Sequence, residues 1–190
     1  MYLTDHEIRK WAMSGNIFPF TEENLNPASL DLCLGKEWRD FLYPDELMYP
    51  DKEGMISIYK TSSLYDWFHV KFNSYYKART GRNMKHLPSA ILGITQETVR
   101  IPTDMTGQIK LKTSPTRMGV GHPIADWIDP GYIGKITLML SCVKTIHLPV
   151  GIRIVQLVLS KLGSHVEQSY AITGHYNHQI LPTGVRTDYV

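Results

Sequence analysis

The sequence has little cysteine, little excess charge of either sign and no long apolar run. Its two cysteines, Cys33 and Cys142, both lie in apolar, strand-like segments, where buried free thiols are usual. A disulfide framework is therefore not expected, and a reducing cytosolic environment fits. Twenty Lys and Arg against 18 Asp and Glu give a net charge of +2, which is too slight to predict a nucleic-acid surface.

Two further absences bear on location and domain organisation. No apolar run approaches the length of a membrane span, and the first residues, 1–7, are charged, so a membrane segment or targeting signal is not expected. A cytoplasmic protein is predicted. The chain shows no repeat or low-complexity linker, and its 190 residues with 43% hydrophobic content suit one domain, 1–190, with a good core.

The densest signal that the sequence does contain lies in residues 125–142. Asp129-Pro130-Gly131 predicts a tight turn, because proline fixes φ for the first central position and glycine tolerates the positive φ that a type II turn needs next. From residue 135 apolar and polar residues alternate, which predicts a strand. A carboxylate at this corner, followed by Tyr132, suggests a small-molecule pocket. An ordinary surface turn is the alternative.

The remaining pattern is mostly that of short strands. A capping box from Thr4 to Glu7, with Gly15 as a stop, predicts one short N-terminal helix. Little else is helical, so a mainly β barrel or sandwich is expected. Strands are predicted at 30–35, 90–95, 97–102, 107–112, 146–149 and 152–160. The last of these, 152–160, is almost continuously apolar, which indicates a central position in the sheet.

Residues 43–90 are the least regular part of the sequence. Within them, the segment 71–82 is both basic and aromatic, a composition that can stack on and neutralise a nucleic acid. A solvated loop or a short helix is the simpler interpretation, so no domain boundary is placed there.

Five short segments stand out in order along the chain: Asn26–Gly35, Lys112–Arg117, Ile128–Gly134, Gly151–Leu157 and Gly174–Gln179. They occur in the order seen in the dCTP deaminase and dUTPase superfamily, and over nearly its whole length the chain resembles the dCTP deaminase branch. The resemblance implies a distorted β-barrel or jelly-roll subunit, a homotrimer with active sites between subunits, and a Mg²⁺-bound deoxynucleoside triphosphate as ligand.

The resemblance implies a triphosphate cradle in residues 112–117. Lys112, Ser114 and Arg117 match the first, third and last positions of the family motif Arg-Ser-Ser-Leu-Ala-Arg, and Thr113 replaces one Ser conservatively. Hydroxyls and cations are suitable donors to phosphate oxygens. Pro115 departs from the motif and removes a backbone donor. From the residues alone, a polar loop would be the simpler interpretation.

The C-terminal tail, about residues 163–190, resembles the family segment that folds over the bound triphosphate. His175 stands where the family pattern Gly-Lys-Tyr-x-x-Gln has Lys, so phosphate affinity is expected to be weaker or pH-dependent. Gln179 matches the final Gln of that pattern. Tyr170 and Ala125 are further expected substrate-binding residues. A mobile tail without a role in the site is the alternative.

Met139 is the largest departure from the family. Deaminases carry a Glu at this position, ten residues after Asp129, and that Glu moves protons between the attacking water and the cytosine ring. A thioether cannot carry a proton. The zinc signature His-x-Glu with Pro-Cys-x-x-Cys is also absent. Loss of dCTP deamination is therefore predicted, with Met139 packing beside the base on the strand face of Thr137 and Ser141.

The residues that the family uses to release pyrophosphate are retained. Asp129 matches the motif Asp that activates water at the α-phosphorus, with Mg²⁺ held through the phosphates and not by a protein site, and Tyr132 matches the aromatic that packs on the deoxyribose. The leading hypothesis is therefore a hydrolase that releases pyrophosphate from a pyrimidine deoxynucleoside triphosphate. One alternative is a dCTP deaminase whose proton shuttle has moved, with Asp126 as the candidate. Another is a catalytically silent nucleotide-binding protein.

Two structural roles complete the expectations. Asp31, a carboxylate inside an apolar run, is expected to be supporting architecture near the nucleotide site or a solvent-facing strand residue. The segment 152–159 is too apolar for an edge strand in a lone barrel, which predicts burial in a trimer core.

Overall fold

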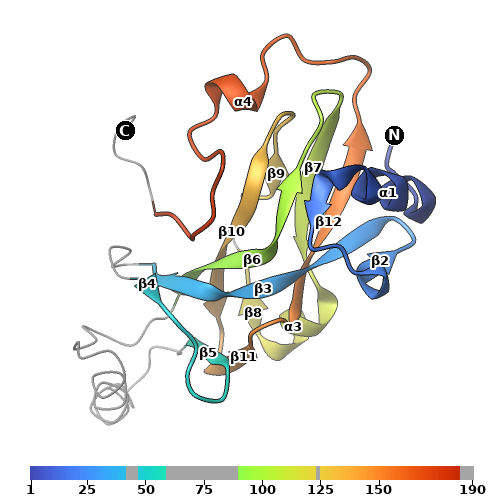
Figure 1. Ribbon diagram of the computed structural model, residues 1–190. Coiled ribbons are helices and arrows are strands. Elements are labelled where there is room, and N and C mark those ends of the chain that lie inside the picture. Colours follow the sequence, from blue (N-terminus) through green and yellow to red (C-terminus); the bar gives the residue numbers. More distant parts are fainter. Residues whose placement is uncertain (42–46, 59–89, 123–124, 185–190) are drawn as a thin grey trace.

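An N-terminal helix leads into a chain built mainly of antiparallel strands (Figure 1). The computed structural model describes residues 1–41, 47–58, 90–122 and 125–184. The helices are α1 (Asp5–Trp11), α3 (Thr113–Met118) and α4 (Tyr170–Thr173), with short helical turns η1 (Ala12–Asn16) and η2 (Glu22–Asn24). The strands are β1 (Ile17–Phe18), β2 (Leu25–Asn26), β3 (Ser29–Asp40), β4 (Leu47–Met48), β5 (Met55–Ile58), β6 (Ala90–Arg100), β7 (Met105–Leu111), β8 (Val120–Gly121), β9 (Trp127–Ile128), β10 (Ile133–Cys142), β11 (Ile146–Pro149) and β12 (Arg153–Lys161).

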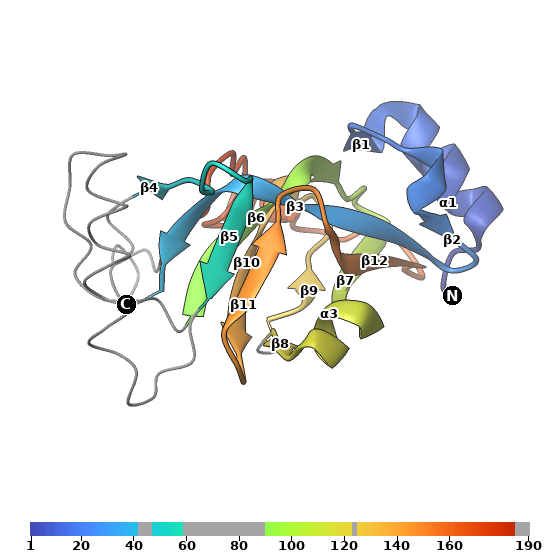
Figure 2. The same ribbon diagram turned by 90° about the horizontal axis from the view of Figure 1, so that it is seen from below.

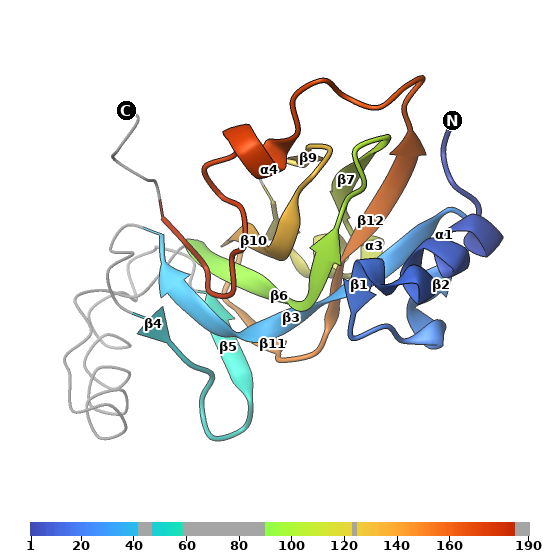
Figure 3. The ribbon, with the colours of Figure 1, turned by 45° about the horizontal axis from the view of Figure 1, so that its top comes forward.

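The strands form one curled sheet and a small two-stranded sheet. In the described residues, the main path runs β8-β10-β6-β3-β12-β7-β9, while β5 pairs with β11 (Figure 2). Strand β9 lies at one end of this path and β10 lies near the other, yet only residues 129–132 join them. The sheet must therefore curl until its ends approach, and the connecting turn lies where they meet (Figure 3). The expected mainly β, barrel-like fold is confirmed.

Strand β10 has the alternation that the sequence predicted. Ile136, Leu138 and Leu140 are buried in the core, whereas Thr137 and Met139 are half-buried on the other face. A strand with one buried face and one partly open face can present side chains to a pocket while its core side fixes their register.

Strand β12 is central, as its apolar sequence indicated. It pairs with β3 on one side and β7 on the other, so it is not an edge strand. Its apolar residues, including Val155, Leu157 and Leu159, are buried within this one subunit. The subunit's own sheet accounts for the burial of these residues, so the apolar sequence does not by itself require a trimer core, and the trimer stays a prediction.

Two strands are longer than expected. Strand β3 continues through Gly35 to Asp40, and β6 is one strand where two were predicted at 90–95 and 97–102. Gly35 does not end the strand, because it allows a close approach: a Cβ there would lie 2.9 Å from the carbonyl oxygen of Ile94. Glycine therefore marks tight packing of β3 on β6.

Residues 113–118 form helix α3, where the residues alone had favoured a polar loop. Lys112 is the N-cap residue, with its amide donating to the Ile154 carbonyl at 3.1 Å. Pro115 lies in the first turn, where the amide of any residue would lack an intrahelical partner, so the missing donor costs little. Gly119 ends the helix at a φ of 97°.

Other expectations concern the N-terminus, the cysteines and the membrane. The amide of Thr4 donates to the Glu7 carboxylate at 3.2 Å, which confirms the capping box. Both cysteines are free thiols, and burial raises the pKa of Cys33 to about 11. In the part of the chain that the structure describes, no helix is long and apolar enough to cross a membrane. The segment 71–82 lies outside the described residues.

Candidate active site

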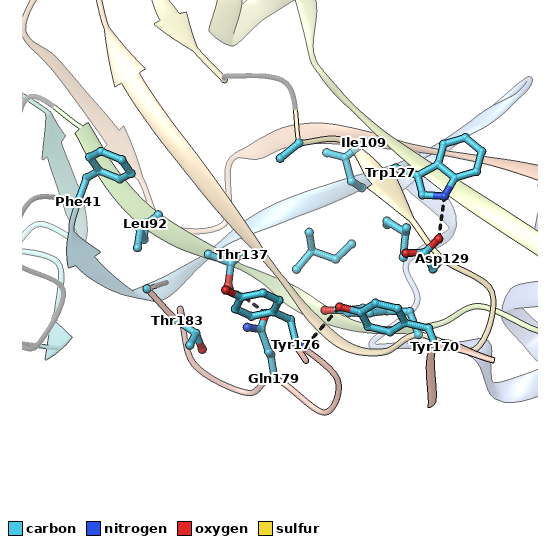
Figure 4. A pocket seen from close by; sticks show the side chains of 15 residues that line it. Phe41, Leu92, Ile109, Trp127, Asp129, Thr137, Tyr170, Tyr176, Gln179 and Thr183 are labelled. Carbon is cyan, nitrogen blue, oxygen red and sulfur yellow. Dashed lines mark hydrogen bonds between the residues drawn. The ribbon is translucent and has the colours of Figure 1, made fainter. Parts of the chain in front are cut away.

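A cavity of about 480 Å³ opens where the two ends of the curled sheet meet (Figure 4). Five expected site residues line it: Ala125, Asp129, Tyr132, Tyr170 and Gln179. Ala125 precedes β9, Asp129 and Tyr132 lie in the β9–β10 turn, and Tyr170 and Gln179 belong to the C-terminal tail. The other described residues lining it are Phe41, Leu92, Ile109, Trp127, Ile128, Ile136, Thr137, Tyr176, Thr183 and Gly184.

The turn that carries Asp129 has a fixed backbone. The Tyr132 amide donates to the Asp129 carbonyl at 3.2 Å, and Gly131 has a φ of 91°, as a type II turn requires. A Cβ at Gly131 would lie 1.8 Å from the Ser169 hydroxyl, so the tail packs directly on this glycine. The carboxylate accepts a hydrogen bond of 3.0 Å from the indole of Trp127.

Tyr132 forms a buried wall of the cavity. Its side chain is 7% exposed, and its hydroxyl donates to the Lys135 carbonyl at 2.6 Å. Burial, with the nearby Tyr170 hydroxyl, raises the pKa of Tyr132 above its ordinary range, so the phenol stays neutral. The rings of Tyr132 and Tyr170 pack at 6.0 Å between centroids. The arrangement offers an apolar face for a ring of a ligand.

The C-terminal tail packs against β10 and supplies lining residues of the cavity within the same chain. The Lys135 amide donates to the Gln179 carbonyl at 2.8 Å, and the Thr137 hydroxyl donates to the Gln179 side-chain oxygen at 3.2 Å. Further along, the Arg39 Nε donates to the Pro182 carbonyl at 2.7 Å. The tail therefore lies along β10 and reaches the end of β3 (Figure 3).

Gly134 makes that pairing possible. A Cβ at this position would lie 2.8 Å from the amide nitrogen of Gln179, and the residue has a φ of 153°. Next to it, the Ile133 amide donates to the Asn177 side-chain oxygen at 2.7 Å. The tail is thus held by main-chain contacts that side chains at 134 would block.

His175 is not among the described residues lining the main cavity. It lines a second hollow of about 260 Å³ formed by the tail itself, together with His178 and Gln179. Its expected phosphate contact therefore remains a prediction.

The expected phosphate cradle lies apart from the cavity. Lys112, Thr113, Ser114 and Arg117 belong to α3 or its cap, and none of them is among the described lining residues. The Lys112 ammonium binds the carboxylate of Asp31, which is 2% exposed. Asp31 is therefore a buried structural residue and not a solvent-facing residue of the strand.

Asp31 also has a neutral donor and a second cation. The Asn26 side-chain amide donates to it at 2.9 Å, and an Arg153 nitrogen lies 3.9 Å from it. Because Lys112 is bound both through its side chain and through its backbone, its first role in this subunit is to join α3 to the sheet.

Met139 shares the face of β10 with Thr137, as expected, but it is not among the described residues that line the cavity. Its carbonyl is 2.7 Å from Nδ1 of His122. A carbonyl only accepts hydrogen bonds, so Nδ1 carries the proton. The other ring nitrogen, Nε2, is buried with no hydrogen-bond partner among the described residues.

The sequence did not identify several aromatic residues of the site. Tyr176 is the Tyr of the recognised tail pattern and Trp127 lies beside the Asp129 motif, so a signal was available for both, whereas Phe41 comes from a distant part of the chain. Among the described residues, no group of three or more His, Cys, Asp or Glu side chains is placed to hold a metal ion.

Comparison with known proteins places this geometry in a family. The family model for dCTP deaminase-like proteins matches residues 2–162. The dUMP-forming dCTP deaminase of Methanocaldococcus jannaschii is 30% identical over 210 residues, which cover 99% of this chain and 98% of its own. The dUMP-forming dCTP deaminase of Acidothermus cellulolyticus is 30% identical over 175 residues, covering 90% and 85%.

A solved structure agrees on the fold. The crystal structure of 2′-deoxycytidine 5′-triphosphate deaminase from Agrobacterium tumefaciens matches with a TM-score of 0.60 at 16% identity. The match covers 85% of this chain and 49% of that one, so this chain spans about half its length. The family model and these relatives show that the chain belongs to the dCTP deaminase-like family.

Proposed function

We propose that this chain binds a pyrimidine deoxynucleoside triphosphate in the Asp129 cavity and hydrolyses it to the monophosphate and pyrophosphate. The observation that carries the proposal is the single acid: Asp129 is the one Asp or Glu among the described residues lining the cavity (Figure 4). Its backbone is fixed by the turn, and its carboxylate meets a neutral donor, not a cation.

The carboxylate can act as a general base. In the proposed step, Asp129 takes a proton from a water molecule while the water oxygen attacks the α-phosphorus, and the bond to the β-phosphate oxygen breaks to release pyrophosphate. Tyr132 and Tyr170 would pack on the sugar and base. Their rings and the tail keep bulk water from the reacting atoms.

Magnesium is expected to enter with the substrate. An ion that is bound mainly by phosphate oxygens needs few ligands from the protein. When bound, Mg²⁺ would neutralise phosphate charge. Among the described residues that line the cavity, Asp129 is the carboxylate that would contact such a complex.

The described lining residues include no Lys or Arg, so cationic side chains from outside this set must neutralise the charge of the triphosphate. Arg117 on α3 and His175 on the tail are the proposed sources. A homotrimer would bring α3 of one subunit to the cavity of another. Light scattering that shows a stable monomer at micromolar concentration would count against this part of the proposal.

Deamination of dCTP is the second candidate, and the names of the relatives favour it. The earlier candidate shuttle, Asp126, is poorly suited: its hydrogen bond to Lys110 lowers its pKa and holds it as a carboxylate. His122 is the better candidate for the shuttle. Its Nδ1 binds the Met139 carbonyl, and its Nε2 has no hydrogen-bond partner among the described residues. A silent nucleotide-binding protein is the third candidate.

Product analysis separates the three candidates. The protein is incubated with dCTP or dUTP and Mg²⁺, and both ammonia and pyrophosphate are measured. Pyrophosphate without ammonia is the expected result. Ammonia from dCTP would establish the deaminase instead, and the His122→Ala variant would then test the shuttle. Binding without either product would leave the silent protein.

A further inference from the structure

Trp127 occupies an unexpected place for the largest apolar side chain. It lies on β9, a two-residue edge strand that pairs through Gln108, and it is 55% exposed. The hydrophobic effect scales with the apolar area removed from water, so a half-exposed ring gains little from packing. Burial alone does not account for Trp127.

Its polar group has a defined partner. The indole Nε1–H donates to Oδ1 of Asp129 at 3.0 Å, and Figure 4 shows this bond at the rim of the cavity. Among the described residues, the indole is the sole hydrogen-bond partner of that carboxylate. A carboxylate accepts at both oxygens, so one indole bond leaves Oδ2 available.

The acid nearest in sequence, Asp126, does not share the indole, because its carboxylate binds the Lys110 ammonium of β7. The backbone of the Asp129 turn is already fixed, so rotation of its side chain is the freedom that remains. The indole bond restricts that rotation, since a charge-assisted hydrogen bond is lost when the carboxylate turns away.

We propose that Trp127 is a positioning residue, whose indole N–H holds the Asp129 carboxylate with its second oxygen free for a ligand. The contact itself is independent of the chemistry. Its kinetic consequence rests on the proposed function. Trp127→Phe keeps an aromatic ring and removes the donor, so it isolates the hydrogen bond.

The contact is tested first by NMR on ¹⁵N-labelled protein. The chain has four tryptophans, and the indole signal missing from Trp127→Phe identifies that of Trp127. In Asp129→Asn the same signal should move, because a charged acceptor is replaced by a weaker neutral one, while the other indole signals stay. A Trp127 signal that does not move in Asp129→Asn would overturn the proposal.

The kinetic role is tested in the same variants. Trp127→Phe should lower kcat on the order of tenfold, as expected for one hydrogen bond to a charged group, with KM and the unfolding midpoint little changed. Tyr49→Phe is the matched control, since it removes one polar group from another exposed aromatic ring, 53% exposed and away from the cavity. It should keep the kcat of the unchanged protein.

The two levels of the hypothesis fail differently. Unchanged kcat in Trp127→Phe, in a protein that does release pyrophosphate, would overturn the positioning role. If the unchanged protein forms neither pyrophosphate nor ammonia, the proposed function fails. In that case the response of the Trp127 signal to Asp129→Asn still decides whether the indole holds the carboxylate.

Discussion

Two aspartates of this chain show how environment assigns a carboxylate its task. Asp31 is 2% exposed and binds the Lys112 ammonium and the Asn26 amide. Asp129 lines an open cavity and meets one neutral indole N–H from Trp127. Asp31 is therefore paired with a cation inside the protein, whereas Asp129 has a carboxylate oxygen available to a ligand.

The difference shows that an aspartate within a family motif does not necessarily bind a ligand or take part in catalysis. Asp31 lies in a recognised family segment and contacts a predicted phosphate ligand, yet it joins β3 to the start of α3. A buried carboxylate paired with a cation resists both ligand binding and proton transfer.

The largest effect is expected from Asp129→Asn. The amide keeps the shape of the side chain and removes the base, so turnover should fall by about 10²–10⁴-fold while nucleotide affinity is retained. Pyrophosphate release and calorimetric titration with a nucleotide measure the two quantities. Asp126→Asn, which changes a neighbouring acid already bound to Lys110, is the control. Normal turnover by Asp129→Asn would remove the basis of the contrast.

Asp31→Ala should act on stability. Its removal leaves the partly buried Lys112 ammonium without its partner, which costs about 3–5 kcal/mol of unfolding free energy. Urea unfolding measures the loss. The exposed pair of Asp126 with Lys110 provides the comparison: Asp126→Ala should cost less than about 1 kcal/mol. Equal costs for the two variants would show that burial does not set the value of these pairs.

Arg117→Ala tests whether α3, the helix that Lys112 joins to Asp31, binds the phosphates of the nucleotide. Unlike Lys112, Arg117 has no ion pair among the described residues, and it is exposed. Its removal should weaken triphosphate binding by about 1.5–3 kcal/mol, since a hydrogen bond to a charged group is lost, with little change in folding. Comparable affinities of the unchanged protein for mono- and triphosphate would contradict the assignment.

Glu97 supplies a third environment and the smallest expected effect. It is 4% exposed and accepts backbone bonds from Cys33 at 3.0 and 3.2 Å, and burial raises its pKa. A raised folded-state pKa gives stability that is fully present below the unfolded pKa and is lost as pH rises through the folded value. Thermal unfolding from acidic to neutral pH should show this decline, and Glu97→Gln should remove that part of it.

Local patterns predicted the fold well. Alternation located β10, the capping box located α1 and the apolar run identified β12 as central. The sequence did not predict α3, because Thr, Ser and Pro are weak helix formers and the helix depends on Lys112 contacting β12 and Asp31. The unbroken β6 was also missed, since pairing with neighbouring strands overrides weak local signals.

The site was predicted only where its residues share a motif. Asp129 and Tyr132 are adjacent in the chain, so a turn and a strand sufficed to place them together. The distances that bring Phe41 and Tyr176 to the same cavity depend on sheet curvature and tail packing, which no local pattern records. The Trp127 contact depends on a side-chain rotamer and was equally invisible.

The tail that closes the cavity also sets the order in which the site can be completed during synthesis. Chains emerge from the ribosome N-terminus first, and β10 is made well before its partners in the tail. The Arg39–Pro182 contact joins residues separated by 143 positions. A nascent chain can therefore form the sheet and present Asp129 before Tyr176 and Gln179, which complete the wall of the pocket, have been synthesised. Assembly of the pocket thus follows formation of the sheet.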